Sequence, residues 1–176
     1  GIDKLLIAWI RGRLESEDLD AKLGGKTIPE ICTLRRKMHF GKRFRSEYFI
    51  LENAFYIMAP GLYFPVTGIA NIVKQYTAQD YLIDRRYRYF YLYFDRLESS
   101  ADFERLRDLV ENIYTNDYLN KQIVNWNQSL TAADGKSGLP QQLDFYSRYV
   151  RNNKERTVVI ISDALRYEVG RTLFEK

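Results

Sequence analysis

The sequence predicts a mainly α-helical protein: a bundle of roughly six to eight helices, followed by the first strand and helix of a truncated α/β domain. Apolar residues recur at helical spacing over most of the chain, and turn signals separate these stretches. One β-branched run, at 157–161, instead has the composition of a buried strand. With 176 residues, 45% of them hydrophobic, the chain can bury a sizeable core.

The predicted helices are bounded by capping and chain-breaking residues. The first places Leu5, Leu6, Trp9 and Ile10 on one side, and the Leu-Gly-Gly turn at 23–25 ends it. In order, we expect helices at residues 3–22, 46–59, 67–76, 80–97, 99–114, 115–130 and 141–151, with a loop at 133–140.

Residues 84–96, DRRYRYFYLYFDR, interleave arginines with aromatics and allow two interpretations. As a helix the stretch is apolar on most sides, which is typical of a helix in the middle of a bundle. Arg85, Arg86 and Arg88 would then reach outward and pair with acids. The alternative is a surface on which nucleic-acid bases stack. We favour the buried helix.

A second basic stretch, RRKMHFGKRFR at 35–45, carries the whole positive excess of the chain. Without its six basic residues, 21 of the 27 basic residues remain against 23 acidic ones, whereas the full chain has a net charge of +4. The segment could bind nucleic-acid phosphates, with Phe40 and Phe44 stacking on bases. We favour a solvated face that pairs with acids such as those at 15–20. The six residues are Arg35, Arg36, Lys37, Lys42, Arg43 and Arg45.

The end of the chain reads as half of a βα unit. The strand predicted at 157–161 is apolar on both faces, as in a parallel sheet, and Ser162 or Asp163 can cap the helix that follows. Ligands in open α/β sheets gather beyond the carboxyl ends of the strands, where Asp163 stands. A carboxylate there suits a metal ion, and helix capping is the alternative. The predicted helix has an apolar stripe of Leu165, Val169 and Leu173.

The stretch VVIISDALRYEVG, 158–170, resembles the opening of the PglZ domain, a branch of the alkaline phosphatase superfamily found in BREX (bacteriophage exclusion) defence systems. Upstream, HFGKRF, DYLIDRRYRYFY and LDFYSRYV resemble the helical region that precedes that domain. The resemblance implies a helical scaffold or interaction domain at 1–151. It also implies the start of a truncated PglZ-type α/β hydrolase domain at 152–176.

In that superfamily the aspartate after the first strand is a metal ligand, which maps to Asp163. Ser162, Arg166 and Glu168 fall in the same motif without an assigned role. The intact parent would hold a divalent metal, zinc in the first place, with magnesium or manganese as alternatives. The family's nucleophile, a Ser or Thr, and its remaining ligands follow the first strand. We therefore expect a fragment, beginning at Gly1, that has no catalytic residues, binds no metal alone and is inactive.

The resemblance implies a parent that is a metal-dependent phosphatase or phosphodiesterase in bacterial anti-phage defence, acting with other BREX proteins and in contact with DNA. Cys32 is the sole cysteine and no run is long enough for a membrane span, so we expect a cytoplasmic protein without membrane partners. Two alternatives remain open. One is a helical interaction module that docks another defence component, and the other is a nucleic-acid-binding module built on 35–45.

Overall fold

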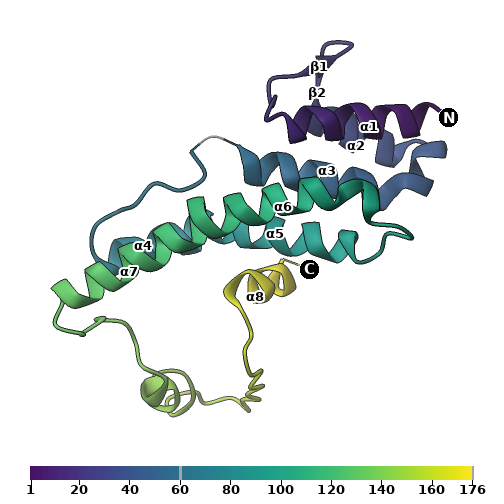
Figure 1. Cartoon of the computed structure of the whole chain (residues 1–176). Coiled ribbons are helices and arrows are strands. Elements are labelled where there is room, and N and C mark those ends of the chain that lie inside the picture. Colours follow the sequence, from purple (N-terminus) through teal and green to yellow (C-terminus); the bar gives the residue numbers. More distant parts are fainter. Residues whose placement is uncertain (60, 176) are drawn as a thin grey trace.

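The structure, a computed structural model, describes residues 1–59 and 61–175 and is mainly α-helical, as the sequence predicts. Figure 1 shows the helices in chain order. The α-helices are α1 (Ile2–Glu15), α2 (Ile28–Lys37), α3 (Arg45–Met58), α4 (Ile69–Gln75), α5 (Tyr81–Phe94), α6 (Glu104–Asn112), α7 (Asn120–Ala132) and α8 (Tyr167–Phe174).

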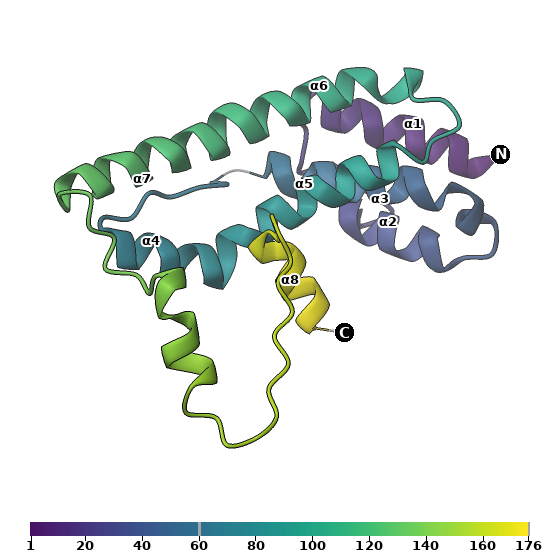
Figure 2. The same ribbon diagram turned by 90° about the horizontal axis from the view of Figure 1, so that it is seen from below.

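Shorter elements connect or extend these helices. Two π-helical stretches make α4 continuous with α5 and α6 continuous with α7, so that two long rods run side by side (Figures 1 and 2). The short elements are β1 (Lys22–Leu23), β2 (Lys26–Thr27), the 3₁₀ helices η1 (Phe40–Phe44), η3 (Ala101–Phe103) and η5 (Gln142–Asp144), and the π-helical η2 (Tyr76–Asp80), η4 (Ile113–Leu119) and η6 (Tyr146–Val150).

The first predicted helix, 3–22, is too long in the sequence-based interpretation. Helix α1 ends at Glu15, and β1 and β2 then form an antiparallel hairpin around Gly24 and Gly25, both with positive φ. The predicted apolar face of α1 is right only in part, since Ile10 is buried and Trp9 packs against the core. Leu5 is 74% exposed, and the buried side is formed by Asp3, Ile7, Ile10 and Leu14.

Helix α2 was missing from the sequence-based prediction, although its start carries a clear signal. The hydroxyl and backbone N–H of Thr27 both donate to the Glu30 carboxylate at 2.8 Å, and Pro29 lies in the first turn. This is a capping box, which supplies partners for the free N–H groups at a helix start. Burial of Ile28, Ile31 and Cys32 then fastens α2 to the rest of the bundle.

Helix α3 forms the centre of the bundle and packs against α1, α2, α5 and α6. Its side chains Tyr48, Leu51 and Ile57 are fully buried, and Phe90 of α5 joins the same core. The prediction of a buried α5 holds in part: the helix packs on α3, but only Tyr81 and Phe90 of it are buried and Leu92 is 39% exposed. Tyr87 of α5 stacks on Tyr114 of η4 with ring centroids 3.7 Å apart.

A long connection, residues 133–166, projects from the bundle between α7 and α8 (Figure 2). The predicted helix at 141–151 is present as one unbroken helical stretch over residues 142–150, in which η5 is 3₁₀ and η6 is π-helical. Several large apolar side chains of this arm are exposed, among them Leu143 at 90% and Tyr146 at 64%. Among the described residues, no helix is both long and apolar enough to cross a membrane.

Candidate functional site

The segment predicted as a strand, 157–161, is extended but unpaired. The only strands of the described chain, β1 and β2, pair with each other beside α1 (Figure 1). Ile160 is 87% exposed and Ile161 is 90% exposed. The prediction of a formed strand is therefore wrong for this chain, because a strand needs neighbours that take up its backbone hydrogen bonds.

Asp163 lies in an exposed loop directly after this extended segment. Its Oδ1 accepts a hydrogen bond from the backbone N–H of Ala164 at 2.9 Å. Ala164 has φ +53°, in the left-handed region that ordinary residues seldom adopt, so the helix cannot run through it. Neither Ser162 nor Asp163 caps α8, contrary to the sequence-based expectation, because α8 begins at Tyr167 with Arg166 at the N-cap position.

Helix α8 returns to the bundle and packs against α5 (Figure 2). Glu168, in its first turn, is 2% exposed and accepts a charge-assisted hydrogen bond from Arg88 of α5. Arg85 of the same helix pairs with Glu175 at 3.0 Å. Two of the three arginines predicted to pair with acids thus hold α8. The third, Arg86, lies over the ring of Tyr56, 4.2 Å from its centroid.

A half-buried carboxylate lies close to this contact. Asp84 of α5 accepts hydrogen bonds from the hydroxyls of Tyr76 at 2.6 Å and Tyr114 at 2.9 Å. Burial raises the pKa of the Asp84 carboxyl and the nearby Glu168 charge adds to the rise, while the two hydroxyls oppose it. Burial, and then the hydrogen bond to Asp84, raise the pKa of Tyr76. The chemistry here is that of a packed polar interface between helices.

The carboxylate expected to bind metal has no partner ligands around it. Within residues 1–59 and 61–175, no group of three or more His, Cys, Asp and Glu side chains could hold an ion. A zinc site needs about four ligands, so Asp163 alone does not make one. The sole histidine, His39, belongs to the basic segment, where its ring packs edge-on against Phe40.

In the basic segment, two arginines are used inside the fold. Arg35 donates from Nε and Nη2 to the two carboxylate oxygens of Asp3, each at 2.8 Å. Arg36 pairs with Glu52 at 2.7 Å. The expected pairing with the acids at 15–20 is wrong, since Glu15 pairs with Arg11 and Asp18 pairs with Arg13.

The other four basic residues of the segment, Lys37, Lys42, Arg43 and Arg45, are exposed. Phe40 beside them is 77% exposed, whereas Phe44 packs against the core. Arg43 also lines a groove of about 920 Å³ together with the acidic Asp3, Glu47 and Asp102. The charge of this surface is therefore mixed.

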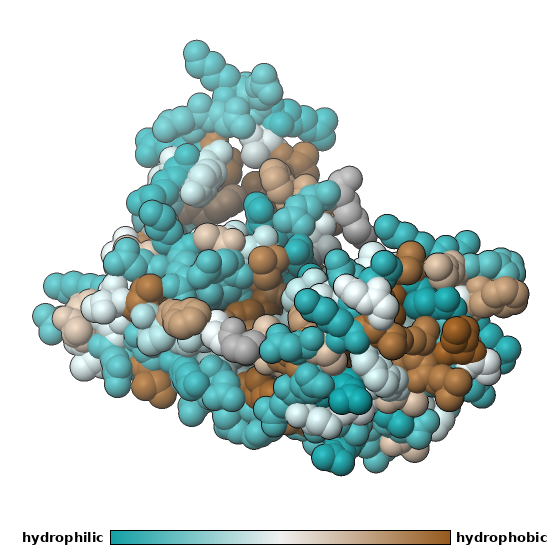
Figure 3. All heavy atoms as spheres, turned by 90° about the horizontal axis from the view of Figure 1, so that it is seen from above, coloured by the Kyte–Doolittle hydropathy of each residue, from teal (hydrophilic) through white to brown (hydrophobic). Residues whose placement is uncertain are grey.

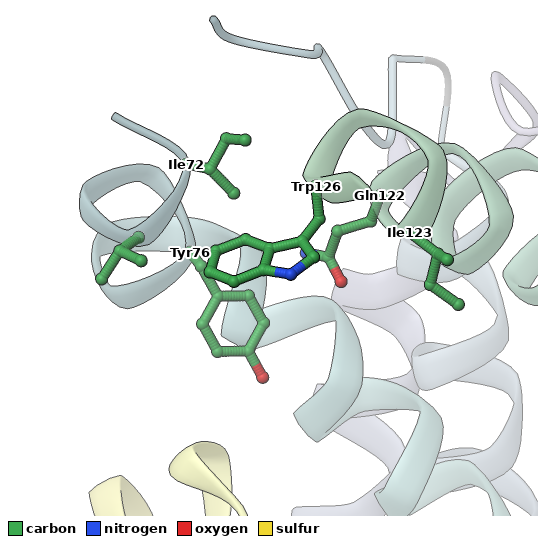
Figure 4. Close-up of a pocket in the computed structure, with 6 residues that line it drawn as sticks. Ile72, Tyr76, Gln122, Ile123 and Trp126 are labelled. Carbon is green, nitrogen blue, oxygen red and sulfur yellow. The ribbon is translucent and has the colours of Figure 1, made fainter. Parts of the chain in front are cut away.

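Sequence reasoning missed a groove of about 260 Å³ between the two long rods. In Figure 4 the indole of Trp126, on α7, points toward Ile72 of α4 and Tyr76 of η2. Ile123, one turn earlier on α7, is 49% exposed. Figure 3 shows further hydrophobic patches on a mostly hydrophilic face. Helix α7 has no buried residue, so its apolar face, which includes Ile123 and Trp126, stays partly accessible to solvent.

Comparison with known proteins finds two curated relatives. The chain is 39% identical over 156 residues to the alkaline phosphatase-like protein PglZ of Bacillus cereus (strain H3081.97). This match covers 82% of this chain and 18% of that protein. It is 33% identical over 116 residues to the alkaline phosphatase-like protein BrxZ of Escherichia coli O9:H4 (strain HS). This second match covers 59% of this chain and 13% of that protein. No family model matches the sequence. No solved structure matches it either.

Both relatives are alkaline phosphatase-like proteins by name, which defines the class. The chain belongs to the PglZ family within that class. It spans less than a fifth of the length of either relative, at 18% and 13%.

Proposed function

We propose that this chain is the helical scaffold of a PglZ-type metal-dependent phosphatase or phosphodiesterase, and that Asp163 is the first metal ligand of its catalytic domain. The observation that carries the proposal is the 39% identity to a protein named alkaline phosphatase-like, over 82% of this chain. The motif at 158–170, with its resemblance to the opening of the PglZ domain, supports the role of Asp163.

The placement of Asp163 is compatible with that role. It follows an extended apolar segment and precedes α8, and its side chain is exposed. The segment at 158–161 would become the first strand when neighbouring strands of the longer protein cover its exposed apolar side chains. A carboxylate at that strand end supplies a hard oxygen ligand. The remaining ligands and the nucleophile, a Ser or Thr, would come from the other residues of the longer protein.

The setting of the proposal is anti-phage defence of the BREX type, in the bacterial cytoplasm and alongside other defence proteins and DNA. The family resemblance supports this setting. The single free cysteine, Cys32, agrees with a reducing compartment.

Substitution of Asp163 in the full-length protein tests the proposal. Asp163→Asn keeps the size of the side chain and removes its charge, so we expect loss of bound zinc and at least about a tenfold loss of phosphodiester hydrolysis. Glu155→Gln, an exposed acid in the same arm, is the matched control. Full zinc content and full turnover in the Asp163→Asn protein would overturn the proposal. The 176-residue chain alone should show no turnover with zinc, magnesium or manganese.

A second candidate function is an interaction module that docks another defence component. The apolar groove at Ile72, Tyr76 and Trp126 favours it, since open apolar surface on a bundle commonly marks a contact site. Trp126→Ala should then weaken capture of BREX proteins in a co-purification, while Trp9→Ala, on another helix, should not. Equal capture by both variants would exclude the groove as the docking site.

A third candidate is nucleic-acid binding by the basic segment, favoured by the exposed ring of Phe40 beside exposed Lys42 and Arg43. Arg35 and Arg36 are engaged in ion pairs within the fold, so only the four other basic residues of the segment could contact phosphates. Replacing Lys37, Lys42, Arg43 and Arg45 by Gln should flatten the dependence of DNA retention on salt concentration. An unchanged salt slope would remove this candidate.

A further inference from the structure

Helix α8 faces the bundle with its polar side. The acidic Glu168 is 2% exposed, whereas the apolar Leu173 and Phe174 of the same helix are 69% and 82% exposed. A helix that packs on a core normally shows the opposite arrangement, with its apolar stripe buried and its charges in water. The contact between α8 and the bundle is therefore built on specific polar pairs.

Those pairs form one connected contact on α5 and η2. Arg88 donates to Glu168, and the ring of Tyr167 lies against Tyr81, with centroids 5.5 Å apart. The Tyr167 hydroxyl donates to the backbone carbonyl of Thr77 at 3.2 Å. The guanidinium of Arg171 lies 5.8 Å from the ring centroid of Tyr81.

The arm that carries Asp163 has no comparable anchor. Within the described chain, the hydrogen bonds and ion pairs of residues 140–165 join residues of that same segment. Since Asp163 lies five positions before Glu168 in the sequence, the docking of α8 limits how far the Asp163 loop can lie from the bundle.

We infer that Arg88 is the positioning residue of the proposed site: through its ion pair with Glu168 it fixes α8, and through α8 the Asp163 loop, on the helical scaffold. The inference rests on the proposed function only for the role of Asp163. The docking itself can be measured without metal or substrate.

The two partners are buried to different extents, which makes the inference testable. The Arg88 side chain is 41% exposed, whereas that of Glu168 is 2% exposed. Without Arg88, the carboxylate of Glu168 would be buried, unpaired and close to the second carboxylate at Asp84. Release of α8 into water relieves this cost. Without the charge on Glu168, Arg88 can reach water where it stands, and an amide oxygen can still accept its hydrogen bond.

Hydrogen exchange of the α8 amides in the 176-residue chain tests the docking. Arg88→Gln should accelerate exchange in α8 on the order of a hundredfold and leave α3 unchanged. Arg85→Gln is the matched control, one turn earlier on α5, because its partner Glu175 is 41% exposed. It should change α8 exchange by less than about threefold. Glu168→Gln should fall between the two, and Arg88→Lys should restore most of the protection.

Spin labels report the position of the loop itself. Labels at Leu165→Cys and Val124→Cys, both at exposed sites, should give a narrow distance distribution that broadens with Arg88→Gln and narrows again with Arg88→Lys. Cys32 is buried and stays unlabelled. Unchanged exchange and distances in Arg88→Gln would overturn the inference. So would equal acceleration in α3 and α8, which would make Arg88 a general stabilising residue. Failure of Asp163→Asn to affect zinc would instead refute the proposed function alone.

Discussion

Substitution of Asp3 by Asn should destabilise the bundle more than any exposed ion pair can. Asp3 is 4% exposed and accepts three hydrogen bonds, two from Arg35 at 2.8 Å and one from the Tyr48 hydroxyl at 2.6 Å. An Asn amide keeps the shape but loses the charge and turns one NH₂ toward these donors. Tyr48 is fully buried, so its hydroxyl cannot turn to water for a replacement partner.

The expected magnitude follows from this burial. Removing one partner of a buried ion pair costs about 3–5 kcal/mol. The Arg35 side chain is 15% exposed and recovers some hydration, so we expect a loss of about 3 kcal/mol in the free energy of unfolding. For a domain of this size each kcal/mol lowers Tm by about 2–4 °C, which predicts a fall of about 6–12 °C.

Urea unfolding followed by far-UV circular dichroism measures the loss, provided that the slope m is the same in both proteins. Asp18→Asn is the matched control, because Asp18 pairs with Arg13 at 3.3 Å in an exposed setting, with side chains 42% and 48% exposed. Such a pair contributes about 0–1 kcal/mol. If Asp3→Asn destabilised the chain no more than Asp18→Asn does, the reasoning from burial would be refuted.

Two further predictions concern titratable groups that are fully or partly buried. Burial raises the pKa of the Cys32 thiol to about 12, so at pH 8 a disulfide reagent should react with the native chain far more slowly than with the urea-unfolded chain. Equal rates would contradict this. The pKa of Asp84 is raised in the folded state, chiefly by burial, so the folded chain holds that proton more tightly than the unfolded chain. Stability should therefore fall as pH rises from the ordinary carboxyl pKa through the raised one, and in urea titrations Asp84→Asn should flatten that fall. An identical pH profile in the variant would contradict the assignment.

Local signals were enough to predict most helices. Helices α3 and α5 lie within the predicted ranges 46–59 and 80–97 to within a residue or so at their N-terminal ends. Helix α2 was missed although Thr27 and Glu30 have capping-box spacing, because its apolar pattern is short and its last turn consists of basic residues. The end of the first helix was predicted too late, at residue 22 instead of Glu15, because helical spacing alone does not show where a helix ends and a hairpin begins.

Pairing over long sequence distances could not be predicted. The partners of Arg35, Arg88 and Arg36 are 32, 80 and 16 positions away, at Asp3, Glu168 and Glu52. Only the packing of α1, α3 and α8 brings these charges together, and no periodicity in the sequence encodes that packing. The strand at 157–161 failed for a related reason: its β-branched composition is a preference for a sheet, and the described chain offers it no neighbouring strand.

Several tyrosines of the bundle donate hydrogen bonds to acidic side chains of other elements. Tyr48 donates to Asp3, Tyr76 and Tyr114 donate to Asp84, and Tyr87 and Tyr91 both donate to Glu111. Each phenol fills apolar space with its ring and gives an acid a partner with its hydroxyl. The arginines of α5 are used in the same way, on Glu168, Glu175 and the ring of Tyr56.

A surface for stacking nucleic-acid bases needs these rings and charges to be free, and in α5 they are engaged within the fold. In a scaffold, by contrast, these side chains are engaged. Their polar pairs hold the helices of the bundle, and also α8, at fixed positions. The aromatic and basic stretch at 84–96 therefore supports the scaffold function, and the distinction rests on where its side chains point, which composition alone does not reveal.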